Sequence, residues 1–375
     1  MKKVLIVSSD DIILYQPTIL NLYDYLKNDF EIQIISFEPE FLGRQKDNTR
    51  DIIYFIPNKI KKKIFRIIDL LGNAVFKRIN KYLFRLNFRL QFLRRYKCSI
   101  LIRELKKQKA DHIIAVDIMP LYAVQKIFGG SHFLSLEILP DDSYRKLIDE
   151  RKIKSVIIQN QQRFDYLFEN IKPKVFYVQN APFCGNICTN DLERHGLVWG
   201  GTIAKTFAVF DFINFIKTFS QYQGMLKGAA PFGTLQKIKS LNKKIIDSGR
   251  LIINTDYLPV NELINFLSKY KIGFCFYDWR LIENNFNYQT APSGRLFMYL
   301  AAGVPVIACD IPGFKFINEY KAGVLIKDYA AQTILKAVET IEADYFSFQK
   351  NAYKAFSDFC FDKNMDSFKT DLMGN

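Results

Sequence analysis

A serine, a glycine and an arginine stand together in the stretch APSGRLFMYLAAGVPVIACD, residues 291–310. Ser293, Gly294 and Arg295 begin an apolar segment that is expected to form a helix and to end at Gly303. The unpaired N–H groups and the positive dipole end of such a helix start favour an anion. A guanidinium adds a fork of donors that suits phosphate oxygens. The stretch therefore predicts a phosphate site, with capping of the helix by Ser293 as the plainer alternative.

A second pattern of this kind comes earlier in the same half of the chain. Gly200, Gly201 and Thr202 follow an apolar run that is expected to be a strand, and Lys205 stands four residues after Gly201. Glycines allow the backbone to approach a pyrophosphate closely, and a lysine can neutralise the charge of a leaving nucleotide. A Gly-Gly pair alone is more often a tight turn, but together with the Ser293 helix it predicts a diphosphate site.

The elements that would position these residues alternate between strand and helix. In the first half, apolar runs predict strands at 3–9, 31–37, 51–56, 112–117, 132–139, 155–159 and 174–180. Helices are expected between them, among others from Pro17, Pro120 and Pro140. Continuous apolar runs are typical of strands buried on both faces, so the pattern predicts a parallel sheet covered by helices.

The pattern pauses at residues 181–190, a plausible linker, and then restarts. Strands are expected at 196–202, 223–229, 250–254, 271–277, 305–310 and 323–326, and a helical tail at about 345–372. We therefore predict an α/β protein with two Rossmann-like, doubly wound domains facing a cleft, where loops at the carboxyl ends of the strands meet a ligand. The expected parts are an N-terminal domain at 1–182 with a basic helical insert at 59–109, a C-terminal domain at 183–345, and a tail at 346–375 that crosses back onto the first domain.

Length and composition agree with a folded two-domain protein. The chain has 375 residues, of which 49% are apolar and 24% charged, and this excludes a disordered chain. No apolar run approaches the ~20 residues that span a bilayer, and no secretory signal is recognisable. The six cysteines and three histidines show no spacing of metal ligands. We expect buried thiols in a reducing cytosol, and neither a metal nor a cofactor.

The positive charge is concentrated in one segment. Residues 59–109 hold 17 basic and two acidic residues, which accounts for the whole net charge of +15. Apolar residues recur there at steps of three or four, and Arg78, Lys81, Arg85 and Arg89 form a basic stripe on another helix face. A solvated helix face is one interpretation. Nucleic acid is another, but no nucleic-acid-binding motif accompanies the charge. We favour an anionic membrane surface.

The segment 291–326 resembles the C-terminal signature of nucleotide-sugar glycosyltransferases with the GT-B fold, especially the retaining group that builds polysaccharides and glycolipids. That signature runs Pro, a small residue and Lys or Arg, then a helix that ends Ala-x-Gly-x-Pro-Val-Ile, and here Pro292 to Arg295 and residues 301–307 match it. Residues 323–325, after Glu319, match its later Gly-Val-Leu strand. Residues 178–183 and 197–205 match more weakly, so the resemblance covers most of the chain in order.

The resemblance implies an enzyme that takes a nucleotide-sugar donor and needs no bound metal. In that family the loop 255–259 would bracket the nucleobase, although Asp256 could instead simply cap the next helix. The implied donor-binding residues are Gly201, Thr202, Lys205, Asp256, Tyr257, Ser293, Gly294 and Arg295.

One departure from the family concerns a pair of glutamates eight positions apart. One of them faces the donor sugar and the other binds the ribose hydroxyls, and here these positions are Thr290 and Met298. A thioether cannot replace a carboxylate as an acceptor. Either the donor is held differently or the protein has lost catalysis.

Carboxylates after strands of the first half would face the acceptor. The candidates are Asp10 and Asp11 after the first strand, Glu137 on its strand, and Asp141 and Asp142 after Pro140. An inverting enzyme needs such a base near the acceptor hydroxyl, whereas a retaining one in this family can rely on the donor phosphate. We select Glu137 and Asp11 as the catalytic candidates.

The sequence therefore predicts a bacterial-type glycosyltransferase on the cytoplasmic face of the plasma membrane. It would move a sugar from a nucleotide-sugar donor to a lipid-linked or cell-surface polysaccharide acceptor. A non-catalytic GT-B-like partner protein is one alternative, because the glutamate pair is missing. A nucleotide-sugar epimerase is another, although such a soluble enzyme has no use for a basic helix.

Overall fold

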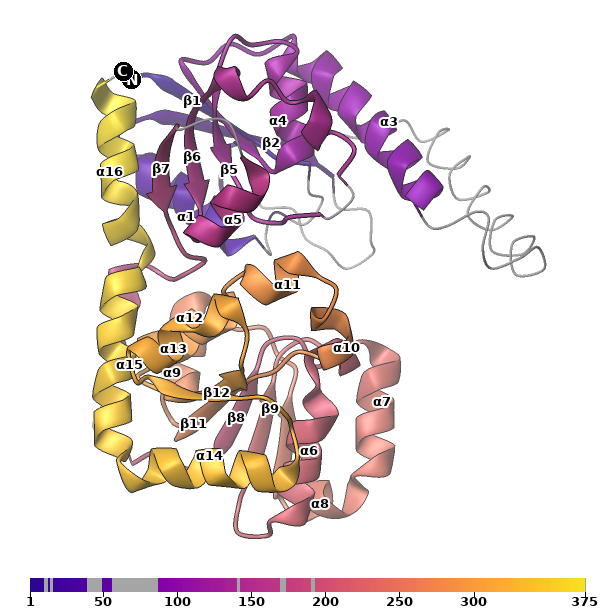
Figure 1. Ribbon diagram of the computed structural model, residues 1–375, viewed down its shortest axis with the longest axis vertical. Coiled ribbons are helices and arrows are strands. Elements are labelled where there is room, and N and C mark those ends of the chain that lie inside the picture. The colour runs from indigo at the N-terminus through magenta and orange to yellow at the C-terminus, as the bar shows by residue number, and fades with distance from the viewer. Residues whose placement is uncertain are drawn as a thin grey trace, which may run out of the picture. The chain divides into compact units, whose positions relative to one another are not determined.

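The computed structural model of the 375-residue chain describes residues 1–9, 13, 16–38, 49–55, 87–139, 142–168, 173–189 and 193–374, without the side chains of 87–93 and 232 (Figure 1). Contacts divide the chain into two compact units. The first comprises Met1–Tyr177 together with Ser367–Asn375, and the second comprises Val178–Asp366. Each unit is built on its own parallel sheet.

The first unit has a seven-stranded sheet in the order β3-β2-β1-β4-β5-β6-β7, and every pairing is parallel. Its strands are β1 (Lys3–Val7), β2 (Glu31–Phe37), β3 (Ile52–Phe55), β4 (His112–Val116), β5 (Ser131–Leu134), β6 (Ile153–Ile158) and β7 (Lys174–Tyr177). Its helices are α1 (Pro17–Leu26), α3 (Asn87–Leu105), α4 (Ile118–Gln125), α5 (Gln161–Leu167) and the end of α16 (Phe361–Gly374).

The second unit has a six-stranded parallel sheet in the order β10-β9-β8-β11-β12-β13. Its strands are β8 (Leu197–Gly200), β9 (Gly224–Lys227), β10 (Leu251–Asn254), β11 (Ile272–Cys275), β12 (Val306–Cys309) and β13 (Gly323–Ile326). Its helices are α6 (Val209–Thr218), α7 (Phe232–Leu241), α8 (Lys243–Asp247), α9 (Val260–Leu267), α10 (Trp279–Ile282), α11 (Phe286–Thr290), α12 (Gly294–Ala301), α13 (Phe316–Glu319), α14 (Ala331–Ala343) and α15 (Tyr345–Phe359).

The sheet of the second unit is covered by helices on both faces. Residues of α9, α12 and α15 form one buried cluster, and residues of α6 and α14 form the other.

In both units the strand order reverses beside the first strand, between β1 and β4 and between β8 and β11. Ligands of doubly wound proteins bind at the carboxyl ends of the strands at such a reversal. The prediction of two Rossmann-like, doubly wound domains is confirmed.

The signature residues after α12 have a structural task. Gly303 adopts a left-handed conformation with φ 61°. Its N–H bonds to the Leu300 carbonyl at 2.9 Å, and the Val304 N–H bonds to the Tyr299 carbonyl at 2.8 Å, which closes the helix in a Schellman motif. A Cβ at position 303 would come within 2.1 Å of the Tyr353 ring. The helix must therefore end on glycine here.

Two expectations for residues 132–150 were wrong. The strand expected at 132–139 ends at Leu134, so Glu137 lies beyond the strand. The helix expected from Pro140 is replaced by two short 3-10 turns, Arg145–Leu147 and Glu150–Lys152. The Asp142 carboxylate accepts the Tyr144 N–H at 3.0 Å, a local bond that competes with helix formation.

The basic insert is described only in part. Arg78, Lys81 and Arg85 lie outside the described residues, and Arg89 lies in α3 but its side chain is not described. From residue 94 onward, α3 buries Cys98, Leu101 and Leu105. Of its basic residues in this part, Arg95 and Arg103 are exposed, whereas Arg94 and Lys97 are partly buried. Among the described helices, none combines the length and apolar character needed to cross a bilayer.

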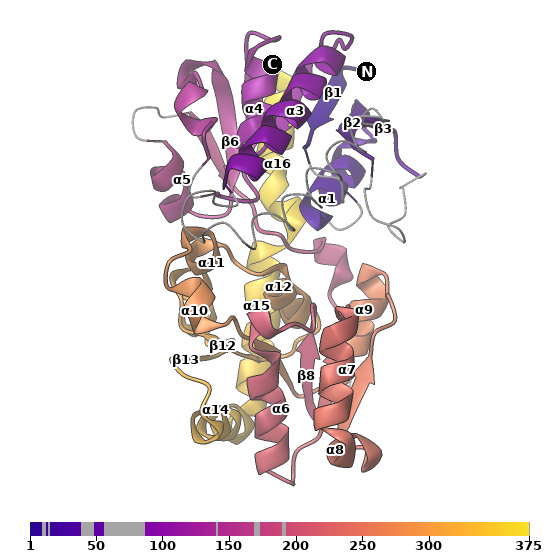
Figure 2. The ribbon, with the colours of Figure 1, turned by 90° about the vertical axis from the view of Figure 1, so that its right-hand side faces the viewer.

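The C-terminal helix returns to the first unit, as expected. Lys369 forms an ion pair with Asp29, and Asp371 pairs with Lys174 at 2.7 Å. The Phe368 ring meets the edge of His132, with the ring centroids 5.3 Å apart. The N-terminus and the end of α16 consequently lie side by side (Figures 1 and 2).

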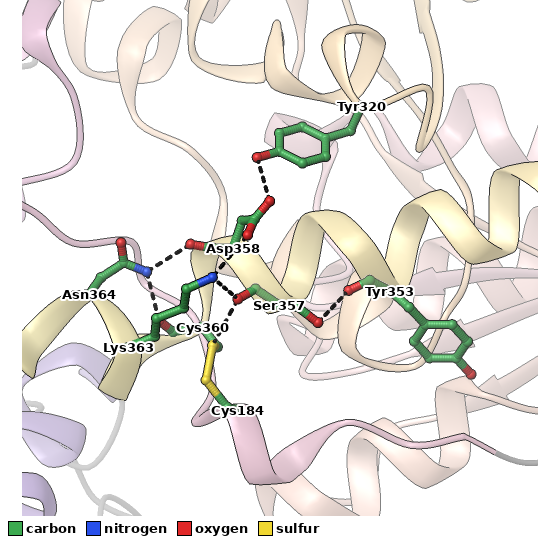
Figure 3. A network of polar contacts seen from close by, with 8 residues as sticks. All are labelled: Cys184, Tyr320, Tyr353, Ser357, Asp358, Cys360, Lys363 and Asn364. Carbon is green, nitrogen blue, oxygen red and sulfur yellow. Dashed lines mark hydrogen bonds and ion pairs between the residues drawn. A yellow bond between two sulfur atoms is a disulfide. The ribbon is translucent and has the colours of Figure 1, made fainter.

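The expectation of free thiols was wrong for one pair of cysteines. Cys184 and Cys360 form a disulfide across 176 positions of sequence (Figure 3). The Asp362 carboxylate accepts the Cys184 N–H at 2.7 Å; among the described residues, these three form a group with the spacing of metal ligands, but bonded sulfurs offer no thiolate to an ion. The other four cysteines are free thiols, and three of them are buried.

Candidate functional site

The start of α12 presents open backbone donors. Ser293 occupies the N-cap position but makes no side-chain capping bond; its hydroxyl instead lies within hydrogen-bond reach of the Cys275 and Tyr277 side chains. Within the described part of the chain, the N–H groups of Gly294 and Arg295 have no acceptor. The alternative in which Ser293 merely caps the helix is therefore wrong, and two donors remain for an anion.

Arg295 is held beside the predicted glycine loop. Its guanidinium lies over the rings of Trp199 and Phe207, 5.1 and 5.2 Å from their centroids. Gly201 adopts φ 101°, and a Cβ there would lie 3.3 Å from the Arg295 Cδ. The Arg295 Nη1 is buried and meets no acceptor among the described residues. A buried cationic donor without a partner is costly, and an anion bound between this loop and α12 would supply one.

The loop at Gly200 and Gly201 allows close packing and does not offer its backbone N–H groups to a ligand. The Gly200 N–H donates to the Tyr299 hydroxyl at 2.5 Å, and the Gly201 N–H donates to the Lys227 carbonyl at 2.8 Å. Neither amide is therefore open to a ligand. Thr202 beyond them is exposed, and Lys205 begins the 3-10 turn Lys205–Phe207.

The predicted nucleobase loop is fixed by a buried lysine. Lys227, at the end of β9 and only 2% exposed, donates to the Asn254 side-chain oxygen at 2.6 Å and to the Asp256 carbonyl at 2.7 Å. The cap position of α9 is Pro259, so the alternative in which Asp256 caps this helix is wrong. Tyr257 is 78% exposed, which leaves its ring free to stack on a flat ligand.

In the first unit, a partly buried aspartate lies at the strand reversal. Asp117 directly follows β4 and has φ 62°, a conformation that is unusual for a residue with a side chain. Its Oδ1 accepts the N–H groups of Leu136 and Glu137 at 2.7 and 3.0 Å. Burial raises the pKa of Asp117 to about 7, although these two N–H groups act in the opposite direction.

Two further charged groups accompany Asp117. Arg163 of α5 is fully buried and donates to the Leu136 carbonyl at 3.0 Å. Loss of hydration lowers the pKa of Arg163 to about 10, while the carboxylates of Glu137 and Asp117 oppose that shift. Glu137 itself is exposed. A proton acceptor, a cation and an exposed carboxylate thus share the carboxyl edge of β4 and β5.

The other sequence candidates of the first unit do not join this group. Asp10, Asp11 and Asp141 lie outside the described residues. Asp142 pairs with Arg94 at 2.6 Å and helps to fix α3. Sequence reasoning missed Asp117, Arg163 and Lys227. Asp117 and Lys227 carried a usable signal, because each is a polar residue at the end of an apolar strand.

The two positions where the resembling family carries glutamates are occupied differently. Thr290 is fully buried, and its hydroxyl donates to the Phe286 carbonyl within α11 at 2.7 Å. Met298 is partly buried against the core cluster of the second unit. Neither side chain can accept a hydrogen bond from a ligand hydroxyl in the way a carboxylate does.

Two doubly wound parallel sheets, each in its own unit, are the architecture of the GT-B fold. No protein-family model and no curated protein matches the sequence. Among solved structures, the chain is similar to trehalose-6-phosphate synthase from Burkholderia multivorans, with a TM-score of 0.67, 11% identity and coverage of 100% of this chain and 99% of the other. It is similar to Anabaena HepE in complex with UDP and glucose, with a TM-score of 0.65, 14% identity and full coverage of both chains.

A third similar structure is the N-terminal domain of the Candida albicans trehalose-6-phosphate phosphatase. It gives a TM-score of 0.68 at 10% identity and covers 100% of this chain and 97% of the other. At such identities the likeness is one of fold, and the predicted GT-B fold is confirmed over the whole chain.

Proposed function

We propose that the chain is a glycosyltransferase that takes a sugar from a nucleotide-sugar donor. The donor diphosphate would lie at the start of α12, between Arg295 and the loop at Gly201, with Thr202 and Lys205 beside it. The nucleobase would lie at Asp256 and Tyr257. Structures of similar fold were solved with UDP and glucose and with UDP-2-fluoro glucose, which supports this class of donor.

One observation carries the proposal. Two N–H groups of α12 and the buried Nη1 of Arg295 lack acceptors in the described part of the chain, and they belong to adjacent residues. Backbone N–H groups at a helix start together with a guanidinium are the usual way to bind phosphate oxygens. A sugar nucleotide is the ligand that brings a diphosphate to this position in the fold.

For the acceptor side, we propose that the carboxylates of the first unit assist the incoming hydroxyl. Glu137 is exposed, and its N–H is held by Asp117, whose pKa is raised to about 7. The Asp117 carboxylate, which is partly ionised at neutral pH, is therefore well suited to take a proton. Asp11 remains a second candidate. Because Thr290 and Met298 replace the glutamates, the donor would be held mainly through its phosphates.

We further propose that the acceptor is a lipid-linked or cell-surface glycan and that the protein acts on the cytoplasmic face of the membrane. The support is the charge of residues 59–109. Basic residues near an anionic surface each contribute about 1 kcal/mol of binding. Replacement of Arg78, Lys81, Arg85 and Arg89 by Gln is therefore expected to abolish sedimentation with phosphatidylglycerol vesicles.

The control for that experiment replaces the exposed lysines Lys239, Lys243 and Lys244 in the second unit by Gln. This variant should still sediment with the vesicles. If the wild-type protein ignores anionic vesicles, the membrane proposal is wrong, and a soluble acceptor or the epimerase alternative gains support.

The test of the donor proposal is a thermal-shift screen of the purified protein against nucleotides and nucleotide sugars. A ligand that binds only the folded state raises the apparent melting temperature. We expect one nucleoside diphosphate and its sugar esters to raise it and other bases to have little effect. No response to any member of the panel would contradict the proposal.

The non-catalytic alternative rests on Thr290, whose hydroxyl is occupied inside α11. A GT-B-like partner protein would bind no nucleotide, or would bind one without turnover. Release of nucleoside diphosphate from the stabilising nucleotide sugar, in the presence of a membrane extract as acceptor, distinguishes the two. Binding without release would favour the partner protein.

A further inference from the structure

A pocket of about 300 Å³ opens in the second unit, next to the proposed diphosphate site. Its wall comes from residues after β8, β11 and β13, so it lies at the carboxyl edge of the sheet. The residues that matter here are Lys205, Phe210, Asp211, Asp278, Trp279 and Tyr329. Its volume is at the lower end for small-molecule sites, too small for a whole nucleotide sugar but sufficient for a single sugar ring.

One side of the pocket is a rigid aromatic wall. Trp279 stacks on Tyr329 with centroids 5.5 Å apart and an interplanar angle of 21°, and Tyr329 stacks on Phe276 at 4.3 Å and 18°. The Tyr329 hydroxyl donates to the Tyr277 carbonyl at 2.7 Å. Because the stack is anchored by this bond, the wall keeps its shape without a ligand.

The wall also carries a donor without a partner. The Trp279 Nε1 is buried and meets no acceptor in the described part of the chain. An indole N–H can only donate, and buried donors that stay unpaired are rare. An acceptor supplied by a ligand would remove this deficit.

The charges in the pocket nearly balance. Asp278 accepts from the Arg280 guanidinium at 2.9 and 2.5 Å, and Lys205 lies near enough to lower the pKa of Asp278 further. Asp211, in the first turn of α6, is partly buried, and this burial raises its pKa. Two carboxylates and two cations do not select an ion. They can accept and donate several hydrogen bonds to a neutral ligand.

We propose that this pocket binds a neutral pyranose ring. The C–H face of the sugar would lie against Trp279, the outer ring of the stack, and its hydroxyls would donate to Asp211 and Asp278. The ring could belong to the glycan acceptor or to the donor, and its place in a transfer reaction rests on the proposed function. Binding of the ring itself does not.

The two tryptophans of the chain allow the two sites to be followed separately. Trp199 is fully buried beneath Arg295 in the proposed diphosphate site, and Trp279 lines the pocket. In Trp199→Phe, the only indole emission comes from Trp279 in the pocket. In Trp279→Phe, it comes from Trp199 in the proposed diphosphate site. Circular dichroism and thermal unfolding check that both variants fold.

The experiment titrates Trp199→Phe with methyl glycosides of glucose, galactose, mannose and N-acetylglucosamine in the millimolar range. We expect at least one to change the emission with a saturable curve. Asp211→Asn on the same background should weaken that binding about tenfold, because it removes a charged acceptor. If no glycoside gives a saturable change, or if Asp211→Asn leaves the affinity unchanged, the inference is wrong.

The arms of the titration also separate the sources of the sugar. A nucleoside diphosphate should change the emission of Trp279→Phe and not that of Trp199→Phe. If a nucleotide sugar changes both and competes with the free glycoside, the pocket holds the donor sugar; if it does not compete, the pocket holds the acceptor sugar. If no nucleotide changes the emission of Trp199, the proposed function is wrong, but the inference about the pocket is not affected.

Should Trp199→Phe fail to fold, ligand-observed saturation-transfer NMR of the wild type and Asp211→Asn gives the same decision. The glycoside should receive magnetisation from the wild type and much less from the variant. Equal transfer from both proteins would overturn the inference.

Discussion

Burial acts in opposite ways on the two charged groups on which the proposed function depends. Arg295 keeps its charge when it is buried, because a guanidinium holds its proton in proteins, so its Nη1 calls for an anion. Asp117 can lose its charge, and burial raises its pKa to about 7. The unpaired Arg295 Nη1 and the buried Asp117 carboxylate both lower the stability of the folded protein, and such groups are typical of functional sites.

Asp117 therefore gives a prediction about stability. Its pKa in the folded state lies above its value in the unfolded chain, so the folded state loses stability as the pH rises from about 4 through about 7. Asp117→Asn removes this titration. The variant should unfold with a free energy higher by on the order of 1–3 kcal/mol at pH 8 and nearly unchanged at pH 4.

Urea unfolding at pH 4, 6 and 8 measures this effect, with Asp149→Asn as a control that should gain nothing, because the Arg151 guanidinium lowers the pKa of Asp149. Sugar transfer by Asp117→Asn should fall at least tenfold, because an amide cannot take a proton from the incoming hydroxyl. An Asp117→Asn variant that keeps the wild-type dependence on pH would show that Asp117 does not titrate in this range.

At the scale of elements, the C-terminal helix packs against one of two neighbouring buried histidines. His112 starts β4 and His132 lies in β5, with ring centroids 5.8 Å apart, and Phe368 of α16 meets the His132 ring. The His132 Nδ1 is 2.8 Å from the Ser155 hydroxyl. Burial lowers the pKa of His132 to about 4, the nearby His112 and Lys154 lower it further, and Asp371 opposes them.

This pair predicts a loss of stability in acid. The pKa in the folded state lies below the unfolded value, so the contribution is fully present above about pH 6.5 and disappears as the pH falls to about 4. For His132 the change amounts to about 3 kcal/mol. His132→Asn should be less stable at pH 7 but should show a flatter acid limb in chemical unfolding.

The exposed His195 provides the control, because His195→Asn should keep the wild-type acid limb. If His132→Asn and the wild type lose stability in parallel below pH 6.5, another group is responsible.

The sequence predicts some elements closely because their apolar runs are continuous. The strands at 31–37 and 323–326 have the expected bounds, and the start of α12 lies where its residues indicate. The helix expected after Pro140 fails because Asp142 bonds locally to the backbone. Helix propensity along the sequence does not show whether the Asp142 side chain will bond to the backbone in place of a helix.

The grouping of site residues depends on strand order, which a single sequence does not contain. Asp117 at the end of β4 meets Leu136 and Glu137 because β4 and β5 are neighbours, so that two N–H groups beyond β5 donate to its carboxylate. Likewise, Lys227 reaches Asn254 because β9 and β10 are neighbours. The Ser293 group was predictable, because its three residues are consecutive and need only one helix start.

At the scale of the whole molecule, one covalent link closes most of the second unit into a loop. The Cys184–Cys360 disulfide spans 176 positions, and its neighbours Asp358 and Lys363 are paired at 2.9 Å (Figure 3). A disulfide that closes a long loop stabilises mainly by restricting the unfolded chain, typically by about 2–5 kcal/mol.

Reduction should therefore lower the stability of the protein by about that amount. The double variant Cys184→Ala/Cys360→Ala should match the reduced wild type and should not respond to reductant, whereas Cys188→Ala should behave as the wild type. Thermal unfolding with and without a phosphine reductant gives the comparison. An unchanged melting temperature after complete reduction, verified by thiol counting, would contradict the structural role of this bond.

The account as a whole depends on an anion held by the start of α12 and Arg295. Calorimetric titration tests this most directly. The ligands are the nucleoside whose diphosphate stabilises the protein in the thermal-shift screen, its monophosphate and its diphosphate. The proteins are the wild type, Arg295→Ala and the exposed control Arg151→Ala. We predict that affinity rises with each phosphate in the wild type and the control, and that Arg295→Ala loses the gain from the second phosphate, about tenfold or more. Equal affinity of Arg295→Ala and the wild type for the diphosphate would contradict the account.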